Sequence, residues 1–334
     1  MAIQEIGYAA MLEQFHPTQL IDYCVAAEQA GFNGVMAADH LQPWVPQQGN
    51  AAFVWAFMAA VAERTKGNVG PGVTCPSFRT HPLVIAQASA TLAAMYPGRF
   101  WLGLGSGEAL NEHPVAGYWP EAPERINMMF EAIEMFNRLF TGKDVKHDGR
   151  HFKMETVRLR TMPDEPPPIY VATAGPITAK RTGQAAQGLI TVGAPEGKLD
   201  LIRSRCEDGR REAGLDTSGF KYILQLHLSW AETDKQALEN AMTEWPNGGM
   251  KFPKADIRSP MDFEQMSRLV RAEDFTGRML ISSDLEAHRK EIQRFADMGF
   301  DRIYLHNVGR NQKEWIEAFG REVLPKIVCC PRAR

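Results

Sequence analysis

The sequence predicts an α/β protein built as a (β/α)8 TIM barrel, and three observations support this fold class. Short apolar runs alternate with helical stretches along the 334 residues, and such alternation indicates a parallel sheet. Several of the runs are apolar throughout, which is typical of strands buried on both faces. The runs number eight, which favours a closed barrel over an open, doubly wound sheet.

The predicted strands are these apolar runs, each bounded by polar or turn-forming residues. They cover residues 6–11, 34–39, 69–75, 100–105, 169–174, 189–193, 222–230 and 302–307. The helical stretches between them cover residues 18–30, 53–65, 83–95, 121–140, 198–213 and 284–298. Gly31, Gly67 and Gly142 closely follow three of these stretches, as glycine commonly does at a helix C-terminus.

Two segments interrupt the alternation, and we interpret both as insertions in one barrel domain that spans residues 1–334. The insertions cover about residues 143–168 and 245–274. Residues 143–164 have the polar pattern of a β-hairpin, with Asp148-Gly149 at its turn, and a proline run follows. Residues 245–274 have no regular pattern, and an irregular loop of this length in a compact domain is usually functional.

The composition excludes several classes of protein. The net charge is −3 and there is no basic block, which argues against a nucleic-acid partner. No apolar run reaches the roughly 20 residues of a membrane span, and the N-terminus lacks the pattern of a signal peptide. The five cysteines form no CxxC pair, so neither a disulfide framework nor a zinc site is expected. These features predict a cytoplasmic protein that acts on a small molecule.

Enzymes with this fold carry their active site at the C-terminal ends of the strands. The polar, aromatic and small residues just beyond the predicted strands therefore form the candidate site. They are Glu13, Asp39, His40, Trp44, Cys75, Glu108, Asn111, Ala174, Gly175 and Pro176. No metal is expected here, because the strand-end histidines His40, His227 and His306 form no H-x-H pair.

His40 and Glu108 are the titratable residues with the clearest chemical use. A histidine at a strand end can take up a proton near neutral pH, although it can also simply bond a neighbouring carboxylate. Glu108 follows a glycine-rich segment, residues 103–107, whose glycines would let a flat ligand approach the backbone. The alternative for Glu108 is a carboxylate at a helix N-terminus. Trp44 is either a wall for an aromatic ligand or a core residue.

Several features suit an anionic group on a ligand. Residues 174–176 form a small-residue turn before a helix, where free N–H groups and the helix dipole favour phosphate. Lys198, Lys251, Lys254 and Arg278 are basic residues expected near the same face, although a surface lysine is usually just solvated. From these residues alone, the chain is a barrel enzyme that binds a flat, phosphorylated ligand.

Together these motifs resemble the luciferase-like barrel superfamily and, within it, the coenzyme F420-dependent glucose-6-phosphate dehydrogenases. The resemblance extends from Gly7 to Pro325. The matching stretches are residues 13–15, 39–40, 42–44, 76–79, 105–112 and 174–176.

The resemblance implies a set of roles for a bound deazaflavin, coenzyme F420. Asp39 would bond the ring, and the Gly72-Val73 peptide would form a cis bulge behind it. Cys75 stands in the wall of the site, where sugar-phosphate members have threonine. Asn111 would help to hold the coenzyme. The turn at residues 174–176 would do the same through Ala174, Gly175 and Pro176.

The resemblance also implies how the reaction would work. His40 would be the base for the substrate hydroxyl, Glu13 would orient His40, and Glu108 would lie near the N1 atom of the ring. Trp44 would flank the reacting centre. A deazaflavin accepts a hydride, so oxidising an alcohol also requires a base for the O–H proton. The implied activity is hydride transfer from a C–OH carbon of an alcohol or sugar phosphate to deazaflavin C5.

The substrate is where the chain departs from the family pattern. Lys254 and Arg278 match phosphate-holding positions of the sugar-phosphate members, and Lys198 is a third candidate. Val192 stands where those members have threonine, so the phosphate-binding set is incomplete. A sugar phosphate and an unphosphorylated secondary alcohol both remain open as substrates, and a homodimer is the family's expected assembly. The alternatives are an FMN-dependent luciferase-like monooxygenase and a barrel that binds a cofactor without catalysis.

Overall fold

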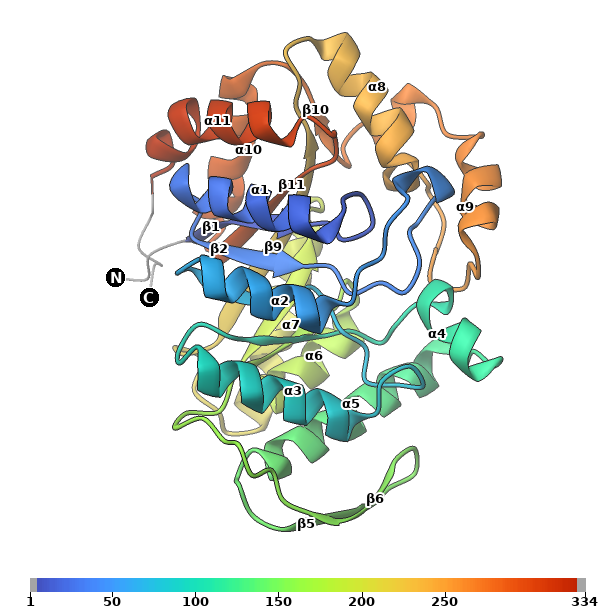
Figure 1. The fold of residues 1–334 in the computed structure, drawn as a ribbon, viewed down its shortest axis with the longest axis vertical. Helices are drawn as coiled ribbons and strands as arrows, with labels where there is room; N and C mark the ends of the chain where they lie inside the picture. Colours follow the sequence, from blue (N-terminus) through green and yellow to red (C-terminus); the bar gives the residue numbers. More distant parts are fainter. Residues whose placement is uncertain (1–4, 329–334) are drawn as a thin grey trace.

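The computed structural model describes residues 5–328, and parallel strands in it form the predicted barrel (Figure 1). Their order around the barrel is β3-β2-β1-β11-β9-β8-β7-β4. Two parallel bridges, Val69 to Phe100 and Thr74 to Leu104, join the ends of this order beside β3 and β4 and close the barrel. The strands are β1 (Glu5–Ala10), β2 (Gly34–Ala37), β3 (Asn68–Pro71), β4 (Leu102–Leu104), β7 (Ile169–Ala172), β8 (Gly188–Val192), β9 (Lys221–Ser229) and β11 (Arg302–Asn307).

The predicted strands agree with the observed ones in position, but several extend too far at their C-terminal ends. The second ends at Ala37 instead of residue 39, and the third ends at Pro71 instead of residue 75. The chain leaves the sheet at these points and turns over the mouth of the barrel. A short strand that was not predicted, β10 (Leu280–Ile281), pairs with the end of β9.

Helices surround the barrel, as Figure 1 shows. They are α1 (Pro17–Gln29), α2 (Val54–Arg64), α3 (Pro82–Met95), α5 (Ala122–Leu139), α6 (Pro176–Ala185), α7 (Glu196–Glu212), α10 (Leu285–Asp297) and α11 (Gln312–Glu322). Pro17, Pro82 and Pro176 each occupy the first helical position, where a missing N–H costs no hydrogen bond. No helix of the described residues is long and apolar enough to cross a membrane.

Two further helices were not among the predicted stretches. They are α4 (Ala109–Ala116) and α8 (Asp234–Glu244). The helix α4 is short and contains Pro114, so its sequence carries little helical signal. Thr233 caps the start of α8, because its side chain accepts a hydrogen bond from the Gln236 N–H. The amphipathic helix α11 was also missed, although Trp315, Ile316 and Phe319 have helical spacing.

The first insertion forms the predicted hairpin. Strands β5 (Val145–Asp148) and β6 (Lys153–Val157) pair antiparallel, beside α5 in Figure 1. Its turn differs from the expected Asp148-Gly149 turn, because residues 149–152 connect the strands and the Gly149 N–H bonds the Phe152 carbonyl at 3.0 Å. The Glu131 carboxylate of α5 accepts the N–H groups of His151 and Phe152, which ties the hairpin to the barrel.

Residues 245–274, the second insertion, were expected to be irregular, but part of this segment is helical. It contains the helix α9 (Pro260–Ser267), which Ser259 caps by accepting the Asp262 N–H. Short 3-10 turns, η2 (Pro246–Gly248) and η3 (Ala272–Phe275), flank it. Phe263 and Phe275 are buried, so the insertion has an apolar anchor that sequence periodicity over this short stretch did not reveal.

Aromatic side chains fill the inside of the barrel below the mouth. The Trp101 ring lies 5.7 Å from the rings of Tyr170 and Tyr304, measured between centroids, and all three residues are buried. Gly70 is required here, because a Cβ atom at this position would collide with the Trp101 ring. This plug closes the interior, so a ligand cavity can open only at the C-terminal ends of the strands.

Candidate active site

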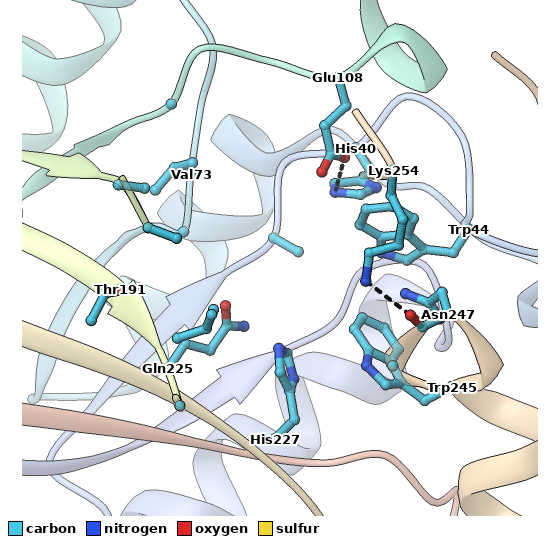
Figure 2. A pocket seen from close by; sticks show the side chains of 18 of the residues that line it. His40, Trp44, Val73, Glu108, Thr191, Gln225, His227, Trp245, Asn247 and Lys254 are labelled. Atoms are coloured by element: carbon cyan, nitrogen blue, oxygen red, sulfur yellow. Dashed lines mark hydrogen bonds and ion pairs between the residues drawn. The ribbon is translucent and has the colours of Figure 1, made fainter. Parts of the chain in front are cut away.

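A cavity of about 770 Å³ opens at the C-terminal ends of the strands, within the range of ligand pockets in enzymes. Figure 2 shows side chains from several strands and from the second insertion pointing into it. Most of the predicted site residues line it: Glu13, Asp39, His40, Trp44, Gly72, Val73, Cys75, Glu108, Asn111, Ala174, Lys198, Lys254 and Arg278. Gly175 and Pro176 do not line it and instead form the start of α6.

His40 lies between two carboxylates. Its Nδ1 atom is 3.3 Å from Oε1 of Glu13, and its Nε2 atom is 3.8 Å from Oε2 of Glu108. Glu13 is fully buried, whereas the Glu108 side chain is 31% exposed to the cavity. Neither oxygen of Glu13 makes a hydrogen bond within the described residues, so its charge acts mainly on His40. This arrangement leaves Nε2 as the ring nitrogen that faces a ligand.

Glu108 titrates unusually because of its surroundings. Burial raises the pKa of its carboxyl group, while nearby His40 and Lys254 lower the pKa and Glu13 raises it further. The net shift is upward, so Glu108 keeps its proton to higher pH than an exposed glutamate does. A carboxyl group with a raised pKa beside a histidine is a typical feature of acid–base sites.

Trp44 fixes the position of the His40 ring. The two ring centroids are 4.9 Å apart, and Trp44 packs edge-on against Phe263 of α9 at 5.1 Å and Trp245 at 6.2 Å. The second insertion therefore supports the His40 ring through Trp44. Trp44 is both a core residue and a wall residue, because it is only 8% exposed and also lines the cavity.

Asp39 belongs to a second charged network, which includes Arg79. Its Oδ2 atom accepts a hydrogen bond from the Thr74 hydroxyl at 2.5 Å, and its Oδ1 atom lies 2.9 Å from Nη2 of Arg79. Arg79 also pairs with Glu112 at 3.4 Å, and Glu112 accepts the Ser77 hydroxyl. Arg79 lines the cavity but was not singled out as a site residue. Its position in the matching stretch 76–79 was the available signal.

The glycine-rich segment and the Gly72-Val73 peptide form one side of the cavity. That peptide bond is cis, as the resemblance implies. Gly107 has φ of +81°, and a Cβ atom there would lie 2.6 Å from Sγ of Cys75, so only glycine fits well. Gly103, in contrast, is required by the close approach of the Pro71 carbonyl, not by a ligand. Burial raises the pKa of the Cys75 thiol well above its usual value, so it is an inert wall residue.

Asn111 has a clear structural function. Its Oδ1 atom accepts the N–H groups of Leu41 at 2.9 Å and Gln42 at 3.4 Å. The Gln42 amide in turn donates to the Leu110 carbonyl. Asn111 thus ties the loop that carries His40 to the segment that carries Glu108, and this contact sets the spacing between the two titratable residues.

The basic residues divide into two groups. Lys254 is half-buried, and its Nζ atom donates to the Asn247 carbonyl at 2.8 Å. Burial lowers the pKa of Lys254, nearby Glu108 raises it and Arg278 lowers it, so these cationic and acidic groups share one region of the cavity. Lys198 lies at the exposed rim. Lys251 does not line the cavity, and it pairs with Asp274 at 2.7 Å.

A further wall, formed by β9, carries polar residues that the candidate set left out. Gln225 and His227 project into the cavity (Figure 2), and residues two apart on a strand face the same side. Trp245 and Asn247 of the second insertion line the adjacent part. His227 was noted only as a possible metal ligand, and no group of three His, Cys, Asp or Glu side chains in the described part of the chain could hold a metal ion.

Comparison with known proteins agrees with this geometry. The model of the luciferase-like monooxygenase family matches residues 2–302, and the chain belongs to this luciferase-like family. It is 34% identical over 324 residues to an F420-dependent glucose-6-phosphate dehydrogenase of Microbacterium testaceum, covering 96% of both chains.

Solved structures give the same result. An F420-dependent secondary alcohol dehydrogenase in complex with an F420-acetone adduct is 32% identical, with a TM-score of 0.92, over 98% of this chain and 99% of that one. The F420-dependent tetrahydromethanopterin reductase of Methanopyrus kandleri has a TM-score of 0.80 at 21% identity, over 98% of this chain and 100% of that one. The second likeness shows the fold alone.

Proposed function

We propose that this protein is a coenzyme F420-dependent dehydrogenase that oxidises an alcohol or a sugar phosphate at a C–OH carbon. The observation that carries the proposal is His40, held between Glu13 and Glu108 at the open end of the barrel. The relatives at 34% and 32% identity are named for F420-dependent dehydrogenation of glucose 6-phosphate and of a secondary alcohol. Both reactions remove a hydride from carbon and a proton from oxygen.

The residues present fit a flat deazaflavin. The cavity has the volume of a ligand pocket, and Gly72, Gly105 and Gly107 on its lining add no side chain to it. Oε2 of Glu108 is buried and makes no hydrogen bond within the described chain, and Glu108 lines the cavity. Buried polar atoms normally have a partner, so this oxygen suits a polar ligand. We propose that Asp39, the Gly72-Val73 peptide, Cys75, Asn111 and Ala174 hold the coenzyme.

In the proposed reaction the coenzyme takes the hydride and the protein takes the proton. Coenzyme F420, when bound, supplies the carbon that accepts the hydride. The substrate hydroxyl donates its proton to Nε2 of His40, and Nδ1 of that ring lies 3.3 Å from Oε1 of Glu13. The charge of Glu13 stabilises the imidazolium that forms.

Glu108 is proposed as the second titratable group of the reaction. Its pKa is raised by burial, so its carboxyl group can hold a proton that a normal glutamate would have lost. Glu108 is thus suited to exchange a proton beside His40 during the reaction.

The basic residues support a substrate with an anionic group. Lys254 and Arg278 lie on the lining of the cavity, and Lys198 stands at its rim. Val192, at the end of β8, is apolar and 41% exposed, so it offers no hydroxyl to a phosphate. We therefore propose an alcohol with moderate anion recognition, for which glucose 6-phosphate and neutral secondary alcohols are the two limiting substrates.

A titration with coenzyme F420 and, in parallel, with FMN tests the coenzyme assignment. We expect tight, selective binding of F420, measured by fluorescence. Preference for FMN would favour the luciferase-like monooxygenase alternative. Binding of F420 without turnover on any alcohol would favour a barrel that binds a cofactor without catalysis.

Assembly and location remain proposals of their own. We propose a homodimer, as the resemblance implies, and light scattering of the purified protein tests it by mass. A cytoplasmic location is supported by the free, buried thiols of Cys24, Cys75 and Cys206, because such thiols persist in a reducing compartment. Cys329 and Cys330 lie outside the described residues.

A further inference from the structure

His227 is a second histidine on the cavity wall, and the proposed reaction does not use it. It lies on β9 beside Trp245, with ring centroids 5.1 Å apart, and Figure 2 shows its ring directed into the cavity. Its Nδ1 atom is 2.8 Å from Nδ1 of His306 on β11. Its Nε2 atom has no hydrogen-bond partner among residues 5–328. What Nε2 offers a ligand depends on where the ring proton lies.

The position of that proton follows from Gln14. The Nε2 amide group of Gln14 donates to the Val308 carbonyl at 2.9 Å and faces the Glu244 carboxylate at 3.4 Å. A backbone carbonyl can only accept a hydrogen bond, so the amide orientation is determined. Its Oε1 atom therefore faces Nε2 of His306 at 3.2 Å, and because this oxygen can only accept, Nε2 of His306 must carry a hydrogen.

His306 then determines the tautomer of His227. His306 is 2% exposed, and burial, together with nearby His227, lowers its pKa well below the usual value, so the ring is neutral. With its proton on Nε2, its Nδ1 atom has a lone pair and accepts from Nδ1–H of His227. The His306 ring also packs edge-on against Trp245, 4.7 Å between centroids, which keeps it from rotating.

The remaining nitrogen of His227 is an acceptor. Burial lowers the pKa of His227 to about 4, and the nearby Lys254 ammonium lowers it as well, so the ring stays neutral at physiological pH. With Nδ1 as the donor to His306, Nε2 carries a lone pair that faces the cavity. An acceptor that loses water when a ligand enters costs free energy unless the ligand donates to it, so this atom favours ligands with a hydroxyl or N–H group at that point.

We propose that Nε2 of His227 is a fixed hydrogen-bond acceptor for a second hydroxyl group of the substrate, so that the enzyme selects polyols over simple monohydric alcohols. The inference rests on the proposed function and specifies its substrate class. His227 is thus a specificity-determining residue. His306 and Gln14 are positioning residues, because they act only through the tautomer of His227. Gln225, on the same face of β9, lies beside this acceptor and lines the same cavity.

Imidazole nitrogen NMR tests the tautomer without any assumption about activity. The expected spectrum has Nε2 of His227 unprotonated and Nδ1 protonated, with the assignment made by comparison with His227→Gln. A protonated Nε2 overturns the proposal, whether or not the enzyme oxidises alcohols.

Turnover tests the selectivity. Butan-2-ol is compared with butane-2,3-diol and butane-1,3-diol as reductants of F420, in the wild type and in His227→Leu and His227→Gln. The wild type should favour at least one diol in kcat/KM by roughly 10- to 100-fold, the effect of one unsatisfied buried polar group. His227→Leu should lose this preference, so that its kcat/KM for the favoured diol falls to near its own value for butan-2-ol, whereas His227→Gln, which can present an amide oxygen, should keep part of it.

The possible failures are distinguishable. An unchanged diol preference in His227→Leu, with F420 affinity equal to that of the wild type, overturns the role of His227 but leaves the dehydrogenase intact. Failure of every alcohol to reduce bound F420 overturns the proposed function and, with it, the substrate role of His227. The tautomer of the ring is then still decided by the NMR experiment.

Discussion

Two histidines line the same cavity, and their surroundings differ in every respect that matters for chemistry. His40 lies between the carboxylates of Glu13 and Glu108, at 3.3 Å and 3.8 Å. His227 lies against the neutral ring of His306 at 2.8 Å and beside the cationic Lys254. The first ring thus faces two acidic side chains, whereas the second faces a neutral ring and a cation.

This difference shows how a barrel assigns separate functions to identical side chains. A base must accept a proton and be stabilised while it holds it, which the buried charge of Glu13 does for His40. A specificity residue must keep a constant hydrogen-bonding pattern, which the neutral chain through His306 and Gln14 does for His227. The residue type alone does not distinguish these functions, because the distinction lies in the neighbours.

Removal of the base should have the largest effect. His40→Ala should lower kcat by about 10²–10⁴-fold, the usual contribution of a positioned general base, because no other described residue occupies its position between Glu13 and Glu108. Affinity for F420 should be unchanged, which fluorescence titration of the same sample checks. A kcat within tenfold of the wild type would show that His40 is not the base of the reaction.

Neutralising the carboxylate behind His40 should have the next largest effect. Glu13→Gln keeps the shape of the side chain but removes the charge that stabilises the imidazolium, so kcat should fall by roughly 10- to 10³-fold with little change in KM. Glu134→Gln, on the exposed face of α5, is the matched control and should be neutral. An equal fall in both variants would indicate a general loss of folding.

The pH profile examines the other carboxylate. Burial raises the pKa of Glu108, and if its protonated form is active, activity falls as pH rises through that pKa. Glu108→Gln cannot titrate, so kcat/KM should drop by about tenfold and this alkaline fall should disappear. Persistence of the alkaline fall in the variant would assign it to a different group.

The same substitution has a predictable effect on stability. Because the folded-state pKa of Glu108 lies above its unfolded value, its stabilising contribution is present at low pH and is lost as pH rises through the folded pKa. The melting temperature of Glu108→Gln should therefore increase relative to the wild type as pH is raised. A constant difference between the two proteins across this pH range is the contrary result.

The smallest effect is expected from substitution of Val192, at the end of β8 beside β9. Val192 pairs in register with Gln225, and a hydroxyl there would add one donor for a phosphate. Val192→Thr should raise kcat/KM for glucose 6-phosphate several-fold, by about 1 kcal/mol, without changing activity on neutral alcohols. Val84→Thr, on the outer helix α3, is the control. No gain would indicate that the physiological substrate carries no phosphate.

The sequence predicted the barrel because burial on both faces imposes a continuous apolar pattern on each strand. Most of the predicted site residues, including His40, Glu108 and Glu13, line the cavity, because strand ends are recognisable and converge in this fold. Strand ends were predicted too long near Asp39 and Cys75, where the chain turns over the site. At these two places the apolar run of the strand continues into the residues of the site, so the run does not mark where the strand ends.

What the sequence could not supply were contacts between distant segments. The pairing of Arg79 with Asp39 and Glu112 joins the segments that follow β2, β3 and β4. The chain from His227 through His306 to Gln14 joins β9, β11 and the loop after β1. Gly175 and Pro176 were assigned to the site from local turn chemistry and from the resemblance, and they start α6 outside the cavity lining. Local pattern thus identified residue types at strand ends, and only the fold decided their partners.

The most direct test of the account is reduction of F420 by alcohols in the absence of oxygen, followed by the loss of coenzyme absorbance. The account predicts that the wild-type protein reduces F420 with a diol or a sugar phosphate and that His40→Ala binds F420 but does not reduce it. No reduction by any alcohol, together with oxygen-dependent turnover of reduced FMN, would contradict it.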